Sequence, residues 1–100
     1  MAIRIRHLPG ERRTVIVISG AVDVLAVPSL RRALAQALRT RAPILVDLTQ
    51  ATSINRAGLA ALVAAHRRAE RAGRSLLLSA EPAQIRTILE AYGIPAEEPH

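Results

Sequence analysis

The chain has 100 residues, which is long enough for a single domain with its own hydrophobic core. Half of the residues are hydrophobic but only one is aromatic, so leucine, isoleucine, valine and alanine must form that core. The absence of cysteine excludes disulfides and thiolate metal sites, and no apolar run approaches the ~18 residues that span a membrane. We therefore expect a cytoplasmic protein without membrane insertion, metal or other cofactor.

The net charge of +6 comes entirely from arginine, because the sequence contains no lysine. A basic protein can bind nucleic acid non-specifically. The arginines, however, are distributed over every predicted element, and no set of aromatic side chains is present on which bases could stack. We therefore expect no specific nucleic-acid partner, and we interpret the charge as a solvated basic surface or as a surface for an acidic protein partner.

The first two predicted elements are strands. Residues 3–6 alternate apolar and charged side chains, as in a half-exposed edge strand, and Pro9-Gly10 provides a turn. Residues 14–19 are rich in β-branched side chains and predict a central strand, which Gly20 ends. Together these segments predict an antiparallel hairpin.

A loop with one acid, Asp23, leads from this strand into the first predicted helix. We interpret Asp23 equally as a cap of the turn or as a contact for a partner. Pro28 suits the first turn of a helix, where its missing amide hydrogen costs least. The following residues place an apolar stripe on one helix face, at Leu30, Ala33, Leu34, Ala37 and Leu38.

The middle of the chain predicts a strand, a polar loop and a long helix. Residues 43–48 form a short apolar run of the kind that is buried on both faces of a sheet. From residue 59 onward one face recurs at helical spacing, formed by Leu59, Leu62, Val63, His66 and Ala69. Residues 53–58 lie between the strand and the helix. Functional groups collect at this edge of open α/β sheets, and a helix amino terminus favours anions.

The last predicted elements are a strand over residues 75–79 and a helix that Pro82 opens and Gly93 ends. We expect Ile94 to fold back onto the core. The inward face of this helix is predicted to consist of Ile85, Ile88, Leu89 and Tyr92.

The order of these elements predicts the fold. After the hairpin each strand is followed by a helix, which implies right-handed crossovers and parallel strands. We therefore expect a single α/β domain over residues 1–95, with a small, mostly parallel mixed sheet of about four strands and helices packed against it. Residues 96–100 are expected to form a flexible tail.

The sequence shows no arrangement of catalytic residues. A hydrolase or transferase needs a nucleophile, a base and an orienting group. Only one histidine, His66, lies near the candidate region, and its place on an apolar helix face indicates a packed, hydrogen-bonded side chain. Asp47 lies inside a strand, where a hydrogen bond to nearby backbone is expected. The isolated Gly20 and Gly58 form no phosphate loop, and no residue cluster has metal-ligand spacing. We therefore do not expect an enzyme.

Two pairs of segments carry a family resemblance. The first pair is Gly20-Ala-Val-Asp23 with Pro28-Ser-Leu-Arg-Arg-Ala-Leu34, and the second is Ile44-Leu-Val-Asp-Leu48 with Ser53-Ile-Asn-Arg-Ala-Gly-Leu59. Together with the closing Tyr92-Gly-Ile94, they resemble the signatures of STAS domains, the fold of bacterial anti-sigma factor antagonists. The resemblance implies a cytoplasmic bacterial module that regulates transcription through protein–protein interaction.

In that family the second signature usually reads Asp-Ser-Ser-Gly. A partner kinase, which is also the anti-sigma factor, phosphorylates the second serine, and about two added negative charges then abolish binding. In this sequence Asn55 replaces the aspartate, Arg56 the first serine and Ala57 the phosphoacceptor. Ala57 has no hydroxyl, so it cannot be phosphorylated.

The resemblance leaves three functions open. The first is an antagonist that binds a kinase-type anti-sigma factor and cannot be switched at the usual site; its contacts are Asp23, Asn55, Arg56, Ala57 and Gly58. The second is an accessory subunit that docks on the ATPase of a bacterial lipid-trafficking ABC transporter. The third is a divergent stressosome-like scaffold in which phosphate could be accepted by Ser53, Thr52 or Thr49. In each case we expect a monomer or weak dimer.

Overall fold

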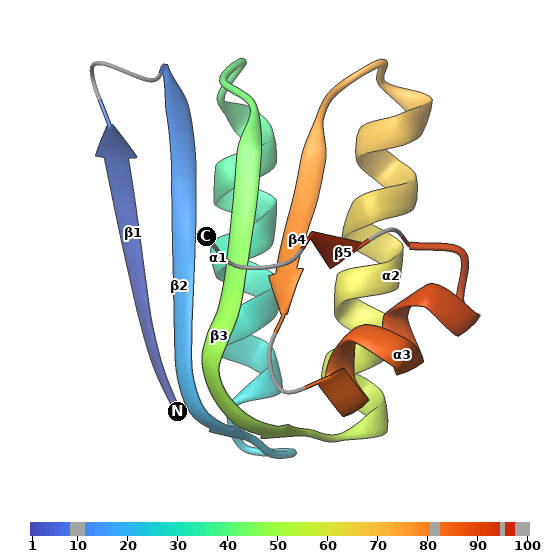
Figure 1. The fold of residues 1–100 in the computed structure, drawn as a ribbon. Coiled ribbons are helices and arrows are strands. Elements are labelled where there is room, and N and C mark those ends of the chain that lie inside the picture. The colour runs from blue at the N-terminus through green and yellow to red at the C-terminus, as the bar shows by residue number, and fades with distance from the viewer. Residues whose placement is uncertain (9–11, 81–82, 95, 98–100) are drawn as a thin grey trace.

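The computed structural model describes residues 1–8, 12–80, 83–94 and 96–97. The elements within these residues (Figure 1) are β1 Ala2–Leu8, β2 Arg13–Val22, α1 Val27–Arg39, β3 Ile44–Ile54, α2 Arg56–Arg71, β4 Leu76–Ala80, α3 Ala83–Ala91 and β5 Ala96–Glu97. The predicted order of strands and helices is present, with a short fifth strand added at the end.

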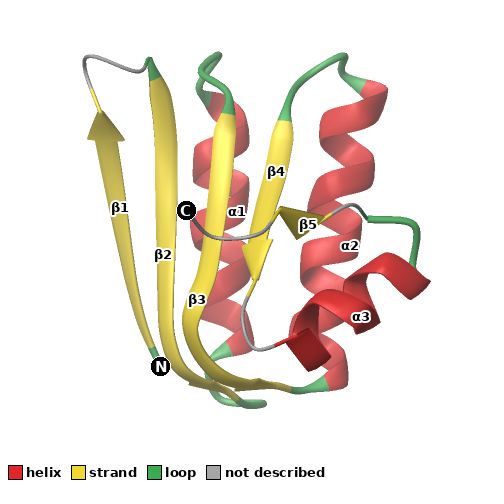
Figure 2. Ribbon diagram, in the orientation of Figure 1, coloured by secondary structure: helices red, strands yellow, loops and turns green. Residues whose placement is uncertain are grey.

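The described strands form one sheet in the order β1-β2-β3-β4-β5. β1 pairs with β2 in antiparallel fashion, whereas each later pair is parallel. In Figure 2, α1 and α2 run alongside the strands and cover one side of the sheet, and α3 packs against β4 and β5. The expected α/β domain, in which an opening hairpin is followed by helical crossovers, is therefore confirmed.

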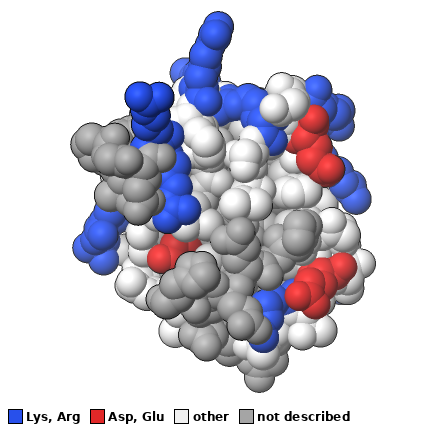
Figure 3. Space-filling view, turned by 45° about the horizontal axis from the view of Figure 1, so that its top comes forward, with Lys and Arg blue, Asp and Glu red and all other residues white. Residues whose placement is uncertain are grey.

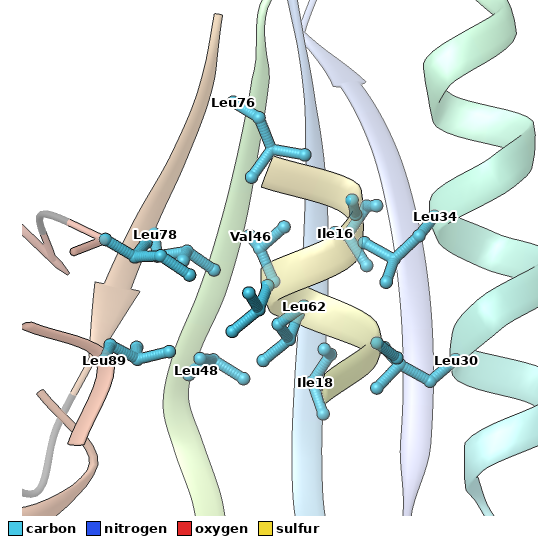
Figure 4. Packing of buried hydrophobic residues seen from close by; sticks show 14 of the residues in the cluster. Ile16, Ile18, Leu30, Leu34, Val46, Leu48, Leu62, Leu76, Leu78 and Leu89 are labelled. Carbon is cyan, nitrogen blue, oxygen red and sulfur yellow. The ribbon is translucent and has the colours of Figure 1, made fainter. Parts of the chain in front are cut away.

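The hydrophobic core lies between the sheet and its helices. Ile16, Val46 and Leu78 occupy neighbouring positions on β2, β3 and β4 and are completely buried. Leu30 from α1 and Leu62 from α2 pack against this row (Figure 4). Burying a side chain of this size stabilises the fold by about 1.5–3 kcal/mol. The apolar stripes predicted for the first two helices therefore face the sheet, as expected.

Side chains cap the end of α1 that lies near the start of β3. The Thr40 hydroxyl donates a 2.8 Å hydrogen bond to the Ala37 carbonyl. The guanidinium of Arg74, which precedes β4, donates to the carbonyl of Leu38 and, over 3.1 Å, to that of Ala42. The bond to Leu38 satisfies a carbonyl in the last turn of α1, and the bond to Ala42 fixes the loop before β3.

β2 and β3 extend beyond their predicted ends. Gly20 does not end β2; with a φ of 81° it lies at an irregularity in the pairing with β3, and the strand continues to Val22. The predicted polar loop after Leu48 is also wrong, because β3 continues to Ile54 (Figure 1). Ala51 is buried in this extension while most of its neighbours are exposed, so the segment lacks the hydrophobic pattern by which strands are predicted.

The predicted inward face of α3 is half wrong. Ile85 and Leu89 are buried, but Ile88 is 41% exposed and Tyr92 is 52% exposed. α3 is a nine-residue helix at the margin of the sheet, so only the row that faces β4 and β5 is covered. The expectation for Ile94 is confirmed, because this residue is buried and its amide donates to the Leu89 carbonyl over 3.0 Å.

The predicted tail begins with a short strand. Ala96 and Glu97 form β5, which pairs in parallel with Leu78 and Ser79 of β4. The remainder of that tail, at residues 98–100, lies outside the described residues, as do the turn predicted at Pro9-Gly10 and the helix start predicted at Pro82.

Candidate functional site

The turn between β2 and α1 is built by Asp23. Its Oδ1 atom accepts hydrogen bonds from the backbone amides of Leu25 and Ala26, both at 3.1 Å. The amide of Ala26 also donates to the Asp23 carbonyl over 3.0 Å, and the amide of Leu30 to the Ala26 carbonyl over 3.1 Å. Asp23 therefore forms an Asx turn that leads directly into the helix.

The junction between β3 and α2 consists of one residue, Asn55. Its extended backbone (φ −81°, ψ 172°) marks the N-cap, and its Oδ1 atom accepts a 2.7 Å hydrogen bond from the amide of Gly58. Its own amide donates to the Val22 carbonyl over 2.9 Å. Asn55 thus caps α2 and ties the start of this helix to the end of β2.

Gly58 is packed tightly against the end of β2. A Cβ atom at this position would lie 2.7 Å from Cγ1 of Val22 and 3.1 Å from Oδ1 of Asn55. Val22 is buried and its side chain is short and branched, so its Cγ1 atom cannot easily move away from an added Cβ atom. Glycine is therefore required here for close approach.

These contacts bring the predicted partner-binding residues together. Val22 touches the start of α2 and is followed directly by Asp23, so residues 23–26 and residues 55–58 form one surface, which we call the crest. Figure 1 shows both junctions at the same end of the molecule. Within the crest, Asp23 and Arg56 are exposed, Asn55 and Ala57 are half-buried, and Gly58 is buried.

The crest also displays two residues that sequence reasoning missed. Val24 is 70% exposed and Leu25 is 86% exposed, although both side chains are large and apolar. Their signal in the sequence was an apolar stretch inside a loop, between a strand and a helix that begins near a proline. Such side chains are normally buried, so their display on a hydrogen-bonded turn marks them as candidate contacts.

The alternative phosphoacceptors lie on the extension of β3. Thr52 and Ser53 are exposed, and Ser53 pairs with Ala21 of β2. Thr49 is half-buried, and its hydroxyl donates a 2.6 Å hydrogen bond to Oδ1 of Asp47, which also accepts from the Thr49 amide at 2.9 Å. The expected local backbone bond of Asp47 is therefore confirmed, whereas phosphorylation at any of these hydroxyls stays a prediction.

His66 is packed and paired, as expected. Its side chain is 13% exposed, and Nδ1 lies 3.1 Å from Oε1 of Glu70, one helical turn further along α2. Among the described residues, no three histidine or carboxylate side chains are grouped as metal ligands would be. None of the helices in the described ranges has the length and apolar character needed to cross a bilayer.

The fold concentrates arginines at the end of the molecule away from the crest. Basic side chains gather there, in the upper part of Figure 3. The elements that end or begin at this end contribute exposed residues at Arg12, Arg39, Arg41, Arg67, Arg68 and Arg71. Several lie in the last turn of a helix, where a positive charge complements the helix dipole. The even spread along the sequence thus becomes an uneven distribution in space.

Solved structures share this architecture. The chain superposes with a TM-score of 0.80 on the anti-sigma factor antagonist SpoIIAA in its unphosphorylated form, at 16% identity, covering 99% of this chain and 90% of that one. The Bacillus cell fate determinant SpoIIAA in the phosphorylated form gives the same TM-score and identity, with 99% and 92% covered. An anti-sigma factor antagonist from Mycobacterium paratuberculosis gives a TM-score of 0.83 at 18% identity, with 99% and 86% covered. At these identities the likeness establishes the fold.

Sequence comparison establishes the family. A search of curated protein sequences finds no match. A family model described as "Mlab, STAS domain" matches residues 9–96, which is most of the chain and includes both junctions of the crest. The protein belongs to the STAS domain family.

Proposed function

We propose that this protein is a non-catalytic regulatory module that binds a kinase-type anti-sigma factor through its crest, in the cytoplasm of a bacterial cell. The family and the fold support a protein-binding module of the antagonist type. The observation that carries the proposal is the exposure of Val24 and Leu25 on the turn that follows β2.

The physical basis of binding is a preorganised apolar anchor. The amides of Leu25 and Ala26 each donate a hydrogen bond to Oδ1 of Asp23 and so hold the backbone around Leu25. The Leu25 side chain is therefore presented without much ordering of the loop on binding. Large side chains that become fully desolvated at the centre of an interface contribute most of the affinity. Arg56, exposed at the start of α2, adds a positive charge to the crest and selects a partner with an acidic surface.

The proposed module lacks the usual switch. One of the similar solved structures is a phosphorylated SpoIIAA and another is the unphosphorylated form of the same antagonist. In this chain Ala57 occupies the second position of α2 and offers no hydroxyl to a kinase. Binding is therefore proposed to be constitutive with respect to this position.

A binding experiment with crest variants tests the proposal. Tagged wild-type protein should recover an ATP-binding anti-sigma kinase from its native cells, and the intact mass of the bait should show no phosphate. Leu25→Ser should weaken the purified complex by about 2 kcal/mol in a calorimetric titration, because it removes a proposed anchor. Ile88→Ser, which alters an exposed isoleucine on α3, is the matched control and should bind normally.

Charge reversal at Arg56 tests partner selection. Arg56→Glu should weaken binding by more than about 1 kcal/mol while leaving the fold nearly unchanged, because the side chain is exposed. Arg4→Glu, on the exposed side of β1, changes the net charge equally and is the control. Unchanged affinity of Arg56→Glu would remove this residue from the interface.

The family description favours a second candidate function. The matching model is described as "Mlab, STAS domain" and not as an antagonist. This supports an accessory subunit that docks on the ATPase of a lipid-trafficking ABC transporter. In the same recovery experiment a transporter ATPase would replace the kinase, and Leu25→Ser would then report on whether the crest is used there.

A further inference from the structure

A groove with a volume of about 340 Å³ lies between α1 and α2. Its apolar lining consists of one buried leucine and five alanines from both helices: Leu34, Ala35, Ala60, Ala61, Ala64 and Ala65. One arginine from each helix, Arg31 and Arg68, completes it. Because no large side chain fills the space between the helices, an apolar concave surface is left open to solvent.

The exposed alanines of this groove are unusual for a surface helix. Ala60 and Ala64 lie one turn apart on α2 and are both exposed. The outward face of such a helix normally carries charged or polar side chains. Here the methyl groups leave a depression whose lining on α2 runs from Ala60 to Arg68. These positions span about 12 Å of helix rise, enough for about two turns of a third helix.

The charges around the groove have one sign. α1 and α2 together carry seven arginines and one acid, Glu70, which pairs with His66. Arg31 and Arg68 are exposed, and within the described part of the chain neither forms an ion pair. Arg31 lines the groove from α1, and Arg68 is the last lining residue on α2. The groove is therefore basic on both flanks.

We propose that this groove binds an acidic amphipathic helix of a protein partner. A face of small apolar side chains would pack on Ala60 and Ala64, and carboxylates on the flanks of that face would reach Arg31 and Arg68. This is helix-in-groove recognition, with charge complementarity fixing the register. Nucleic acid fits less well, since the lining has no aromatic side chain for stacking. The groove is a second surface, lined by none of the crest residues, and the proposal does not depend on what the crest binds.

A designed peptide provides the direct test. The probe is a fluorescein-labelled, hydrocarbon-stapled helix of about 16 residues with alanine and leucine on one face and glutamate on both flanks, long enough to span the groove. The control peptide has lysine in place of every glutamate. Fluorescence anisotropy at low ionic strength should show saturable binding of the glutamate peptide and none of the lysine peptide.

Paired variants locate the site. The double variant Arg31→Glu/Arg68→Glu should lower the affinity for the glutamate peptide at least about tenfold. Arg4→Glu/Arg6→Glu has the same net charge but places the change on exposed positions of β1, and should lower it much less. Ala64→Leu should also weaken binding about tenfold by filling the groove, whereas Ala91→Leu, at an exposed position of α3, should not.

Three results would overturn the proposal. They are an equal loss of affinity for the glutamate peptide in both double variants, equal binding of the two peptides by the wild type, or no saturable binding of the glutamate peptide. Circular dichroism shows whether each variant is folded. Leu25→Ser should bind the glutamate peptide as the wild type does, so a failure at the groove is distinguishable from a failure of the proposed crest interface.

Discussion

The two strand-to-helix junctions of the crest perform the same connection with different amounts of chain. Between β2 and α1, four residues form an Asx turn around Asp23, and this length leaves Val24 and Leu25 exposed. Between β3 and α2, Asn55 alone makes the turn, and Gly58 is pressed against Val22. In each junction a side-chain oxygen accepts hydrogen bonds from the backbone, at Asp23 in the first and at Asn55 in the second. The length of the connection therefore decides the character of each junction. The four-residue connection exposes apolar side chains, whereas the one-residue connection packs its helix directly against the end of β2.

The junction between β3 and α2 is the more sensitive of the two to an added methyl group. Gly58→Ala should destabilise the protein by about 2 kcal/mol, because the contact with Val22 costs more than the gain in helix propensity of up to ~1 kcal/mol. Urea denaturation measures the free energy of unfolding. In the background of Val22→Ala, Gly58→Ala should lose most of its effect on the free energy of unfolding. If the effects of the two substitutions simply add in the double variant, the two side chains do not clash.

Removal of the cap at the same junction should have a smaller effect. Asn55→Ala deletes the acceptor of the 2.7 Å hydrogen bond from Gly58 and should cost about 1 kcal/mol of stability. Asn55→Asp keeps an acceptor and adds a negative charge at the start of α2, so its stability should remain within about 0.5 kcal/mol of the wild type. Equal denaturation midpoints for the alanine and aspartate variants would contradict this role.

At the junction between β2 and α1, a substitution should change the local dynamics more than the free energy of unfolding. Asp23→Ala removes two 3.1 Å hydrogen bonds in an exposed turn and should cost only about 0.5 kcal/mol. Amide hydrogen exchange at Leu25 should nevertheless become faster, because its acceptor Oδ1 is gone, whereas Ala26 keeps its bond to the Asp23 carbonyl. Asp23→Asn keeps Oδ1 and is the control. Unchanged exchange in Asp23→Ala would show that the turn is held by other contacts.

The sequence predicted the parts of this molecule that follow a regular hydrophobic period. The stripes of α1 and α2 and the central strands could be read because burial on one face repeats along each element. The extension of β3 could not, since Ala51 is buried while neighbours such as Thr52 and Ser53 are polar and exposed. Nor could the exposure of Ile88, which depends on how far the sheet reaches beneath α3.

The predicted contact residues lie together in the structure, and their role as contacts stays a prediction. The resemblance identified Asp23 and the start of α2, and the structure places them together through the contacts of Val22. Val24 and Leu25 were not predicted as contacts, because apolar residues in a sequence are expected to be buried. Both are exposed on the Asx turn at Asp23. The concentration of arginines at one end likewise depends on which elements begin and end there.

The edges of the sheet carry a consequence for self-association. β5 covers the outer side of β4 with only two residues, whereas β1 presents a seven-residue border opposite its pairing with β2. A long border of this kind can template the addition of a strand from another molecule, and charged side chains oppose such growth. Arg4 and Arg6 are exposed on β1. Two copies meeting there would bring like charges together, so this border is protected against fibril-like stacking.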